Sequence, residues 1–187
     1  MRNSVILIGY MGCGKSTVGQ RLAGLLDWSF LDTDAWIEEK EGMTIKEIFA
    51  AQGEAYFRDL ETFCLKEFTG NKKIQQKLVE RELNEKKTVS KGCVFSVGGG
   101  LPVREENREL LKEMGQVIYL KASPDTIYER LKSDTTRPLL QTDNPLQKIK
   151  DMLESREKKY QDAANFVICV DGKSISEILE EIQEIIG

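Results

Sequence analysis

The stretch Gly9-Tyr10-Met11-Gly12-Cys13-Gly14-Lys15-Ser16 decides the fold, because it fits the pattern G-x-x-x-x-G-K-[S/T]. It lies between a short apolar run, residues 5–8, and a segment of helical periodicity, residues 15–26. In this pattern the glycines let backbone N–H groups point at a phosphate, the lysine reaches the β- and γ-phosphates, and the serine hydroxyl binds Mg²⁺. The sequence therefore predicts a nucleotide-binding loop, in which Cys13 occupies a variable position without a catalytic role. The alternative is a glycine-rich turn with a surface lysine.

Apolar runs alternate with helical patterns along the rest of the chain. Four further strands are predicted, at residues 28–31, 93–97, 116–120 and 166–170. Helices are expected over residues 35–68 with breaks near Gly42 and Gly53, over residues 103–113, from Pro124 onward, and over residues 146–160 and 175–186. Strands that alternate with helices favour an α/β fold, in which helices cover both faces of a parallel sheet.

Composition excludes several classes of protein. The chain of 187 residues, 40% hydrophobic and 31% charged, fits one globular domain. Its net charge of −4 excludes a globally basic nucleic-acid binder, so a local cluster of Lys, Arg and N–H groups must meet any anionic ligand. The absence of histidine excludes Ser-His-Asp and Cys-His catalysis. No signal peptide or membrane-length apolar stretch is recognisable, so we expect a cytoplasmic protein that binds neither nucleic acid nor membrane.

The four cysteines lack the spacing of a metal site. Cys64, Cys93 and Cys169 lie within or beside apolar runs and are predicted as buried thiols outside any disulfide. Reduced cysteines suit a cytoplasmic protein.

Two acidic residues, Asp32 and Asp34, follow the second predicted strand. In an open α/β sheet the carboxyl ends of the strands form the mouth of the ligand site. Carboxylates there can hold Mg²⁺ or accept a hydroxyl proton, although Asp-x-Asp alone is often a solvated turn or a helix cap. Beside a phosphate-binding loop we favour the first interpretation.

Three further features are ambiguous by themselves. Arg58 and Glu61 are neighbours on one helix face, and the simpler interpretation of their spacing is a surface ion pair. The other is that Glu61 fixes the Arg58 guanidinium for recognition of a carboxylate. The glycines at residues 98–100 either let a ligand lie on the backbone or form a flexible turn. Residues 133–144 read as a long exposed loop, where Arg137 is either a surface charge or a group that stabilises phosphoryl transfer.

Together these motifs resemble the shikimate kinase family over almost the whole chain. The matching segments are residues 9–17, 32–34, 57–61, 98–100 and 137–140, and Arg156 with Tyr160. The resemblance implies a three-layer P-loop kinase fold with a five-stranded parallel sheet in the order 2-3-1-4-5, in a single domain over residues 1–187. A mobile lid is implied at about residues 133–144. The implied activity is ATP-dependent phosphorylation of the 3-hydroxyl of shikimate, a step toward chorismate and the aromatic amino acids, with Mg²⁺ as cofactor.

The resemblance also implies a role for each matching residue. ATP is bound by Gly12, Cys13, Gly14, Lys15, Ser16, Thr17, Arg130 and Arg137. Shikimate is bound by Asp34, Arg58, Gly98, Gly99, Gly100 and Arg156, with Glu61 behind Arg58. Mg²⁺ is bound by Ser16 and Asp32, and the catalytic residues are Lys15, Asp34 and Arg137. Asp34 is the candidate base.

The sequence departs from the family pattern in two places. Arg58 and Gly98 are further apart than the family usually has them, and the extra residues fall in a charged segment, about residues 70–87, predicted as a helical insertion away from the active site. A proline expected between Arg156 and Tyr160 is absent.

Two other functions remain as alternatives. One is a different small-molecule kinase of the same fold, such as a gluconate kinase, and the other is a catalytically silent nucleotide-binding module. A gluconate kinase would not need the set formed by Arg58, the glycines at 98–100 and Arg156. A silent module would have lost a catalytic residue, and no obvious catalytic position is lost here. We expect a monomer, with a dimer as the alternative.

Overall fold

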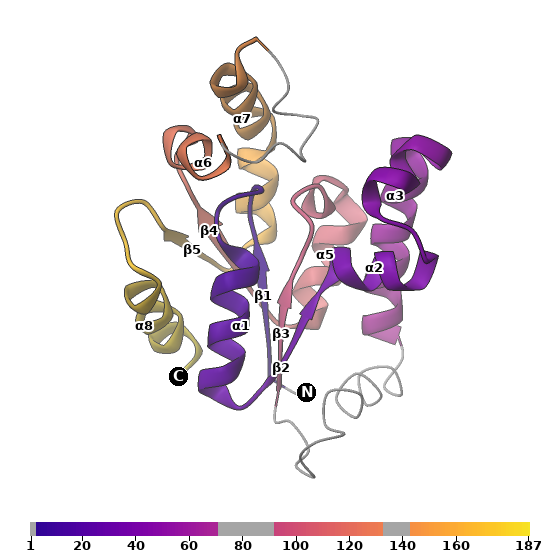
Figure 1. Cartoon of the computed structure of the whole chain (residues 1–187). Coiled ribbons are helices and arrows are strands. Elements are labelled where there is room, and N and C mark those ends of the chain that lie inside the picture. The colour runs from indigo at the N-terminus through magenta and orange to yellow at the C-terminus, as the bar shows by residue number, and fades with distance from the viewer. Residues whose placement is uncertain (1–2, 71–91, 133–142) are drawn as a thin grey trace.

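The computed structural model describes residues 3–70, 92–132 and 143–187 (Figure 1). Its five strands are β1 (Asn3–Ile8), β2 (Ser29–Asp32), β3 (Gly92–Ser96), β4 (Gln116–Lys121) and β5 (Phe166–Cys169). All neighbouring strands are parallel, and their order is β2-β3-β1-β4-β5. The sheet predicted from the family resemblance is confirmed, and every strand lies within two residues of its predicted limits.

The helices follow the predicted pattern closely. They are α1 (Lys15–Leu26), α2 (Thr33–Glu41), α3 (Ile45–Gly70), the 3₁₀ turn η1 (Leu101–Val103), α5 (Glu105–Met114), α6 (Pro124–Leu131), α7 (Pro145–Ala163) and α8 (Ile175–Ile186). The predicted breaks are real, since Gly42 and Gly53 have φ of 64° and 82°. The segment predicted as one helix from residue 103 starts as η1 instead, and α5 follows it. Within the described ranges, no helix is long and apolar enough to cross a membrane.

The core has two layers because side chains alternate along the buried central strand. Val5 and Leu7 of β1 face the cluster that includes the inner sides of α1 and α8, which lie side by side in Figure 1. Ile6 and Ile8 face the opposite cluster, to which α3 and α5 contribute. Helices therefore cover both faces of the sheet, and only the strand ends and the loops beyond them are left to build a site.

Burial of the cysteines is predicted correctly only in part. Cys64 is buried on α3, whereas Cys93 is half-buried and Cys169 is exposed. Cys169 lies on β5, an edge strand, where only Ile168 is buried among the four strand residues. An apolar run does not ensure burial in an edge strand: in the described part of the chain β5 pairs with β4 alone, and its outer side chains stay exposed although α8 packs on it.

The predicted lid and insertion fall almost entirely outside the described residues. Of the lid, residues 133–142 are not described, and of the insertion only Gly70, which ends α3, is described. At the far border of the lid, Asn144 caps α7 by accepting a hydrogen bond from the Gln147 N–H at 3.1 Å. Both segments stay predictions.

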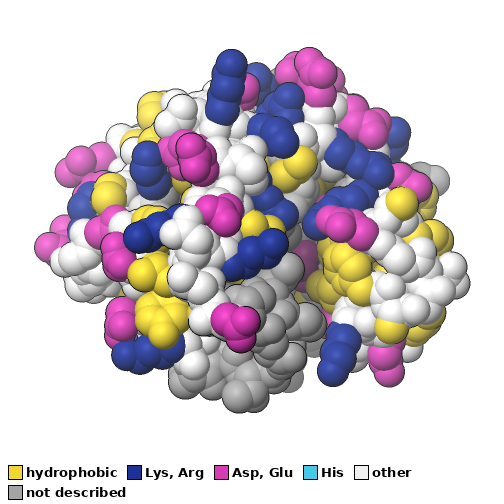
Figure 2. All heavy atoms as spheres, turned by 90° about the horizontal axis from the view of Figure 1, so that it is seen from above, with side chains coloured by type: hydrophobic (Ala, Val, Ile, Leu, Met, Phe, Trp, Pro, Cys, Tyr) yellow, Lys and Arg dark blue, Asp and Glu magenta, His cyan; other side chains and the backbone are white. Residues whose placement is uncertain are grey.

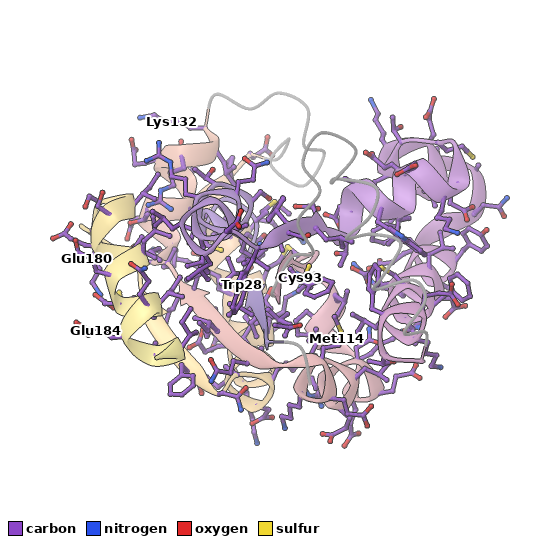
Figure 3. All side chains as sticks on the ribbon, turned by 90° about the horizontal axis from the view of Figure 1, so that it is seen from below. Trp28, Cys93, Met114, Lys132, Glu180 and Glu184 are labelled. Atoms are coloured by element: carbon purple, nitrogen blue, oxygen red, sulfur yellow. The ribbon has the colours of Figure 1, made fainter. Side chains whose placement is uncertain are left out.

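Of the predicted site residues that the structure describes, none lies at the end of the sheet where β1 and β4 begin. A cavity of about 540 Å³ opens there, lined among others by Trp28 and Met114, which Figure 3 labels in the view from below. Glu180 and Glu184 project outward from α8 in the same view and are exposed. The predicted site residues instead gather at the opposite end, where the strands finish.

Two glycines of α1 have opposite surroundings. A Cβ on Gly19 would lie 2.6 Å from Cε2 of Phe30, whereas one on Gly24 would meet nothing within 4 Å. We expect Gly24→Ala to raise the free energy of unfolding by up to about 1 kcal/mol, because alanine favours a helix. Gly19→Ala should lower it by about 1–3 kcal/mol through overpacking. Urea unfolding measures both, and equal stability of the two variants would contradict the close packing of α1 on β2.

Candidate active site

The β1–α1 loop forms the cradle that the sequence predicts. Gly12 and Gly14 have φ of 78° and 101°, a left-handed conformation that residues with side chains rarely adopt. They turn the chain so that α1 begins at Lys15 and presents its positive N-terminal end to the hollow of the loop. Lys15 Nζ donates hydrogen bonds to the carbonyls of Gly9 at 2.8 Å and Tyr10 at 3.0 Å. Its ammonium group is thus held over the loop, where an anion would bind.

The loop lines a cavity of about 500 Å³ at the carboxyl ends of the strands. Figure 2 shows this end from above, with Lys and Arg side chains gathered around a hollow between the main body and the α2–α3 lobe. The predicted residues that line the cavity are Gly12, Cys13, Gly14, Lys15, Ser16, Thr17, Asp32, Asp34, Gly98, Gly99 and Arg130. Arg130 reaches it from α6 and donates to the carbonyls of Gly12 at 3.1 Å and Cys13 at 3.2 Å.

Hard oxygen donors meet beside the loop. Ser16 Oγ donates to Asp32 Oδ2 at 2.8 Å and lies 3.2 Å from Ser96 Oγ. The other oxygen of Asp32 accepts the Asp34 N–H at 3.0 Å, so the same carboxylate also caps α2. The described residues contain no cluster of three acidic or thiol ligands that would cage a metal. One carboxylate and a hydroxyl fit Mg²⁺, which protein sites commonly share with the phosphates of a substrate.

The glycine turn after β3, residues 98–100, brings the acceptor side of the site together. A Cβ on Gly98 would lie 2.5 Å from Asp34 Oδ1 and 3.0 Å from Glu61 Oε1. The Gly98 N–H donates to the buried Thr33 hydroxyl at 3.0 Å. Two carboxyl groups from different helices therefore converge on one glycine, and any side chain at this position would displace them.

The other two glycines of the turn make room for different neighbours. A Cβ on Gly99 would lie 3.2 Å from the Gly9 carbonyl oxygen, so the turn rests against the phosphate-binding loop. A Cβ on Gly100 would lie 2.0 Å from Arg58 Nη1. Space therefore requires glycine at positions 98 and 100, whereas a side chain at position 99 would make a tight contact with the loop.

The two carboxyl groups at this turn are unusual in their electrostatics. Asp34 Oδ1 and Glu61 Oε1 are shielded from solvent and have no hydrogen-bond partner within the described part of the chain. Burial, assisted by the charge of Asp32, raises the pKa of Asp34 to about 6 against the opposing effect of Lys15. Burial likewise raises the pKa of Glu61 to about 7, against the charge of Arg58. Buried oxygens without a partner are costly, and a ligand hydroxyl would satisfy that of Asp34, which lines the cavity.

Arg58 is caged by acidic side chains. Its Nη1 donates to Glu61 Oε2 at 2.8 Å, and Glu54 Oε1 accepts from its Nε at 3.2 Å and its Nη2 at 2.9 Å. The side chain of Glu61 is only 1% exposed, so the pair is not the surface ion pair that spacing alone favours. The predicted contact between Glu61 and Arg58 is present, and it fixes the plane of the guanidinium.

Arg156 reaches the same turn from α7. Its Nη1 donates to the Gly99 carbonyl at 3.4 Å, and the Tyr160 hydroxyl donates to that carbonyl at 2.6 Å. Arg156 and Tyr160 lie one helical turn apart on α7, which continues to Ala163. Although the expected proline between them is absent, both side chains point at the glycine turn. Arg137 lies outside the described residues.

Sequence reasoning missed several residues of the site. Ser96 and Thr33 lie at the carboxyl ends of β3 and β2, and the positional argument that singles out Asp32 would have found them too. Lys173 lines the cavity from the loop between β5 and α8, where no motif or spacing indicates it. Tyr10 contacts both Lys15 and Arg156, although its position in the loop pattern is variable.

This parallel sheet, with a lysine-bearing glycine loop after β1 and an acidic end to β2, defines a P-loop kinase that acts on a small molecule. The shikimate kinase family model matches residues 11–79 and 75–187. The chain belongs to the shikimate kinase family.

Individual relatives agree with this membership. The shikimate kinase of Sulfurihydrogenibium sp. is 43% identical over 97% of this chain and 96% of its own length. The structure of shikimate kinase from Acinetobacter baumannii in complex with shikimate has a TM-score of 0.83 at 36% identity, covering 98% of this chain and 92% of that one. A gluconokinase from Sinorhizobium meliloti shares the fold alone, with a TM-score of 0.54 at 18% identity over 99% of this chain and 91% of that one.

The raised pKa of Glu61 makes stability depend on pH. Between the ordinary value of 4.5 and about 7, the folded state keeps a proton that the unfolded chain releases. The free energy of unfolding of the unliganded protein therefore contains a contribution that is lost as pH rises through this window. We expect Glu61→Gln, whose amide does not titrate, to lose less stability over that rise. Asp34 contributes in the same direction mainly below pH about 6, so the comparison is sharpest above it.

Urea unfolding of the wild type and Glu61→Gln, repeated across this pH range, measures the difference. Identical pH dependence in the two proteins would contradict the raised pKa of Glu61.

Proposed function

We propose that this protein transfers the γ-phosphoryl group of ATP to the 3-hydroxyl of shikimate, a step toward chorismate and the aromatic amino acids. The observation that carries the proposal is the glycine turn at residues 98–100. A phosphate-binding loop, two carboxyl oxygens that have no hydrogen-bond partner among the described residues, and a caged arginine all lie against it. The loop suits a triphosphate, the carboxyl oxygens suit substrate hydroxyls, and the arginine suits a substrate carboxylate. Shikimate carries both hydroxyls and a carboxylate. Membership of the family and the relative whose structure holds shikimate support the same substrate.

On the nucleotide side, the backbone N–H groups of residues 12–17 bind the phosphates. Lys15 exchanges its two carbonyl acceptors for β- and γ-phosphate oxygens, which offer its ammonium group charged partners. Arg130, held on the carbonyls of Gly12 and Cys13, borders the adenine. Positioning and charge neutralisation are most of what phosphoryl transfer requires, which is consistent with a chain that has no histidine.

Ser16 and Asp32 would hold Mg²⁺, the cofactor we propose. When bound, the ion neutralises charge on the β- and γ-phosphates. Ser16 lies at the first turn of α1 and Asp32 at the end of β2, so both oxygens are fixed by regular structure. We assign to Arg137, on the predicted lid, the role of stabilising the negative charge that remains on the phosphoryl group during transfer.

On the acceptor side, Arg58 and Arg156 bind the shikimate carboxylate, and Glu61 holds Arg58 in place. Asp34 Oδ1 accepts the hydrogen bond of the reacting hydroxyl and then its proton. The substrate oxygen forms a bond to the γ-phosphorus as the bond from that phosphorus to ADP breaks. Gly98, Gly99 and Gly100 let the substrate approach the backbone between these groups.

We further propose that the protein acts as a monomer in the cytoplasm. The described groups assigned above converge on one glycine turn and the loop beside it, which supports a site built within one chain. The four cysteines form no disulfide, as is usual in a reducing compartment.

An ADP-release assay with purified protein, ATP and Mg²⁺ tests the activity. We expect ADP release with shikimate as acceptor and none above background with gluconate. Shikimate is a ring that presents its hydroxyls at fixed distances from its carboxylate, whereas open-chain gluconate must be ordered on binding. Faster release with gluconate than with shikimate would refute the proposal in favour of the other kinase.

The role of Asp34 is tested by Asp34→Asn, which keeps the shape of the side chain but cannot take up the proton. We expect kcat to fall by roughly 10²–10⁴-fold with a much smaller change in the shikimate KM. Asp162→Asn, an exposed change on α7, is the matched control and should leave kcat unchanged. A kcat of Asp34→Asn close to that of the control would leave Asp34 with a positioning role only.

A further inference from the structure

Tyr10 belongs to the phosphate-binding loop, but its side chain leaves the loop and enters the core. The residue is only 2% exposed. Its hydroxyl lies 3.3 Å from the Met152 sulfur on α7 and donates to it. The Cζ of Arg156, also on α7, lies 5.9 Å from the centre of the Tyr10 ring. One side chain of the nucleotide-binding loop thus supports the helix that carries a proposed substrate-binding arginine.

The backbone of Tyr10 is tied to the site as well. Its carbonyl accepts a hydrogen bond from Lys15 Nζ at 3.0 Å. Its Cα lies 3.7 Å from the position of a Cβ on Gly99, whose carbonyl accepts the hydrogen bond from Arg156. The guanidinium of Arg156 is therefore bounded by the ring of Tyr10 and by the glycine turn that rests on the same residue.

The contacts of Arg156 differ from those of Arg58. Arg58 is caged by two carboxylates, whereas Arg156 hydrogen-bonds neutral groups: the Gly99 carbonyl at 3.4 Å, beyond the usual range for this bond, and the Tyr160 hydroxyl. The face of a buried aromatic ring attracts a cation within about 6 Å of its centre. Because the Tyr10 ring is immobilised in the core, it restricts the orientations of the guanidinium without occupying its N–H groups. The N–H groups that do not bond Gly99 and Tyr160 remain available to a carboxylate.

We propose that Tyr10 is a positioning residue, whose ring holds the Arg156 guanidinium ready for the substrate carboxylate. The inference deepens the proposed function and rests on it, since it takes Arg156 as a ligand of the carboxylate. The pattern G-x-x-x-x-G-K-[S/T] allows any residue at position 10. A tyrosine there can therefore serve binding of the acidic acceptor substrate without disturbing phosphate binding.

The test compares Tyr10→Leu with Tyr10→Phe by calorimetric titration with shikimate and, separately, with ADP. Leucine removes the aromatic face, whereas phenylalanine keeps it and loses only the hydroxyl. We expect Tyr10→Leu to weaken shikimate binding by about three- to thirty-fold. Its ADP affinity should stay at the wild-type value, and Tyr10→Phe should bind shikimate as the wild type does. A Phe variant as weak as the Leu variant would overturn the role of the ring.

A double-mutant cycle separates positioning from general loosening of the core. If the ring acts through Arg156, adding Tyr10→Leu to Arg156→Ala costs no further shikimate affinity. An equal loss in both backgrounds, or unchanged shikimate affinity in Tyr10→Leu alone, would overturn the inference. Thermal unfolding verifies that each variant is folded, and Tyr10→Met replaces Tyr10→Leu if the latter is not.

Failure of the proposed function has a different signature. Wild-type protein that binds ADP but not shikimate would refute the substrate. Unchanged shikimate binding in Arg156→Ala alone would remove Arg156 from the carboxylate site, and the inference about Tyr10 with it.

Discussion

Close packing around the glycines at residues 98–100 is the constraint on which the site depends. A Cβ on Gly98 would collide with the Asp34 carboxyl and one on Gly100 with the Arg58 guanidinium, whereas one on Gly99 would press on the Gly9 carbonyl. Protein interiors are packed densely enough that a single added methyl group is felt. The turn therefore sets the distance between the phosphate-binding loop and the acceptor side, and phosphoryl transfer is sensitive to that distance.

The electrostatics of the site follow from the same packing. Converging carboxyls shielded from water acquire raised pKa values, and Arg58 beside them offsets only part of the cost of burial. Such groups destabilise the empty protein and are satisfied when a ligand supplies donors and an opposite charge. Proteins commonly accept strain of this kind at a functional site while the core supplies the stability. Here the core is two apolar layers on a buried sheet, and Val97 and Leu101 of one layer flank the turn directly.

Local patterns predicted much of this structure, and they failed where distant parts of the chain decide the outcome. The limits of α1 and the break at Gly53 depend on neighbouring residues, and both are present. Asp32 was found because the end of a strand has a known place in a parallel sheet. Burial of Cys169 was wrong because an apolar run does not reveal whether its strand lies at an edge.

By itself, the sequence determined the α/β alternation, the phosphate-binding loop and, through the order of its motifs, the family. These follow from local periodicity, from turn chemistry and from residues close together in the chain. Only the tertiary structure decided that the Arg58–Glu61 pair is buried and that Tyr10 lies under Arg156. It also decided that each glycine of residues 98–100 makes room for a different neighbour. The physical reason is that the burial of the Arg58–Glu61 pair, like the other contacts, depends on residues distant in sequence. Their distances and burial depend on how helices pack on the sheet, which no spacing along the chain encodes.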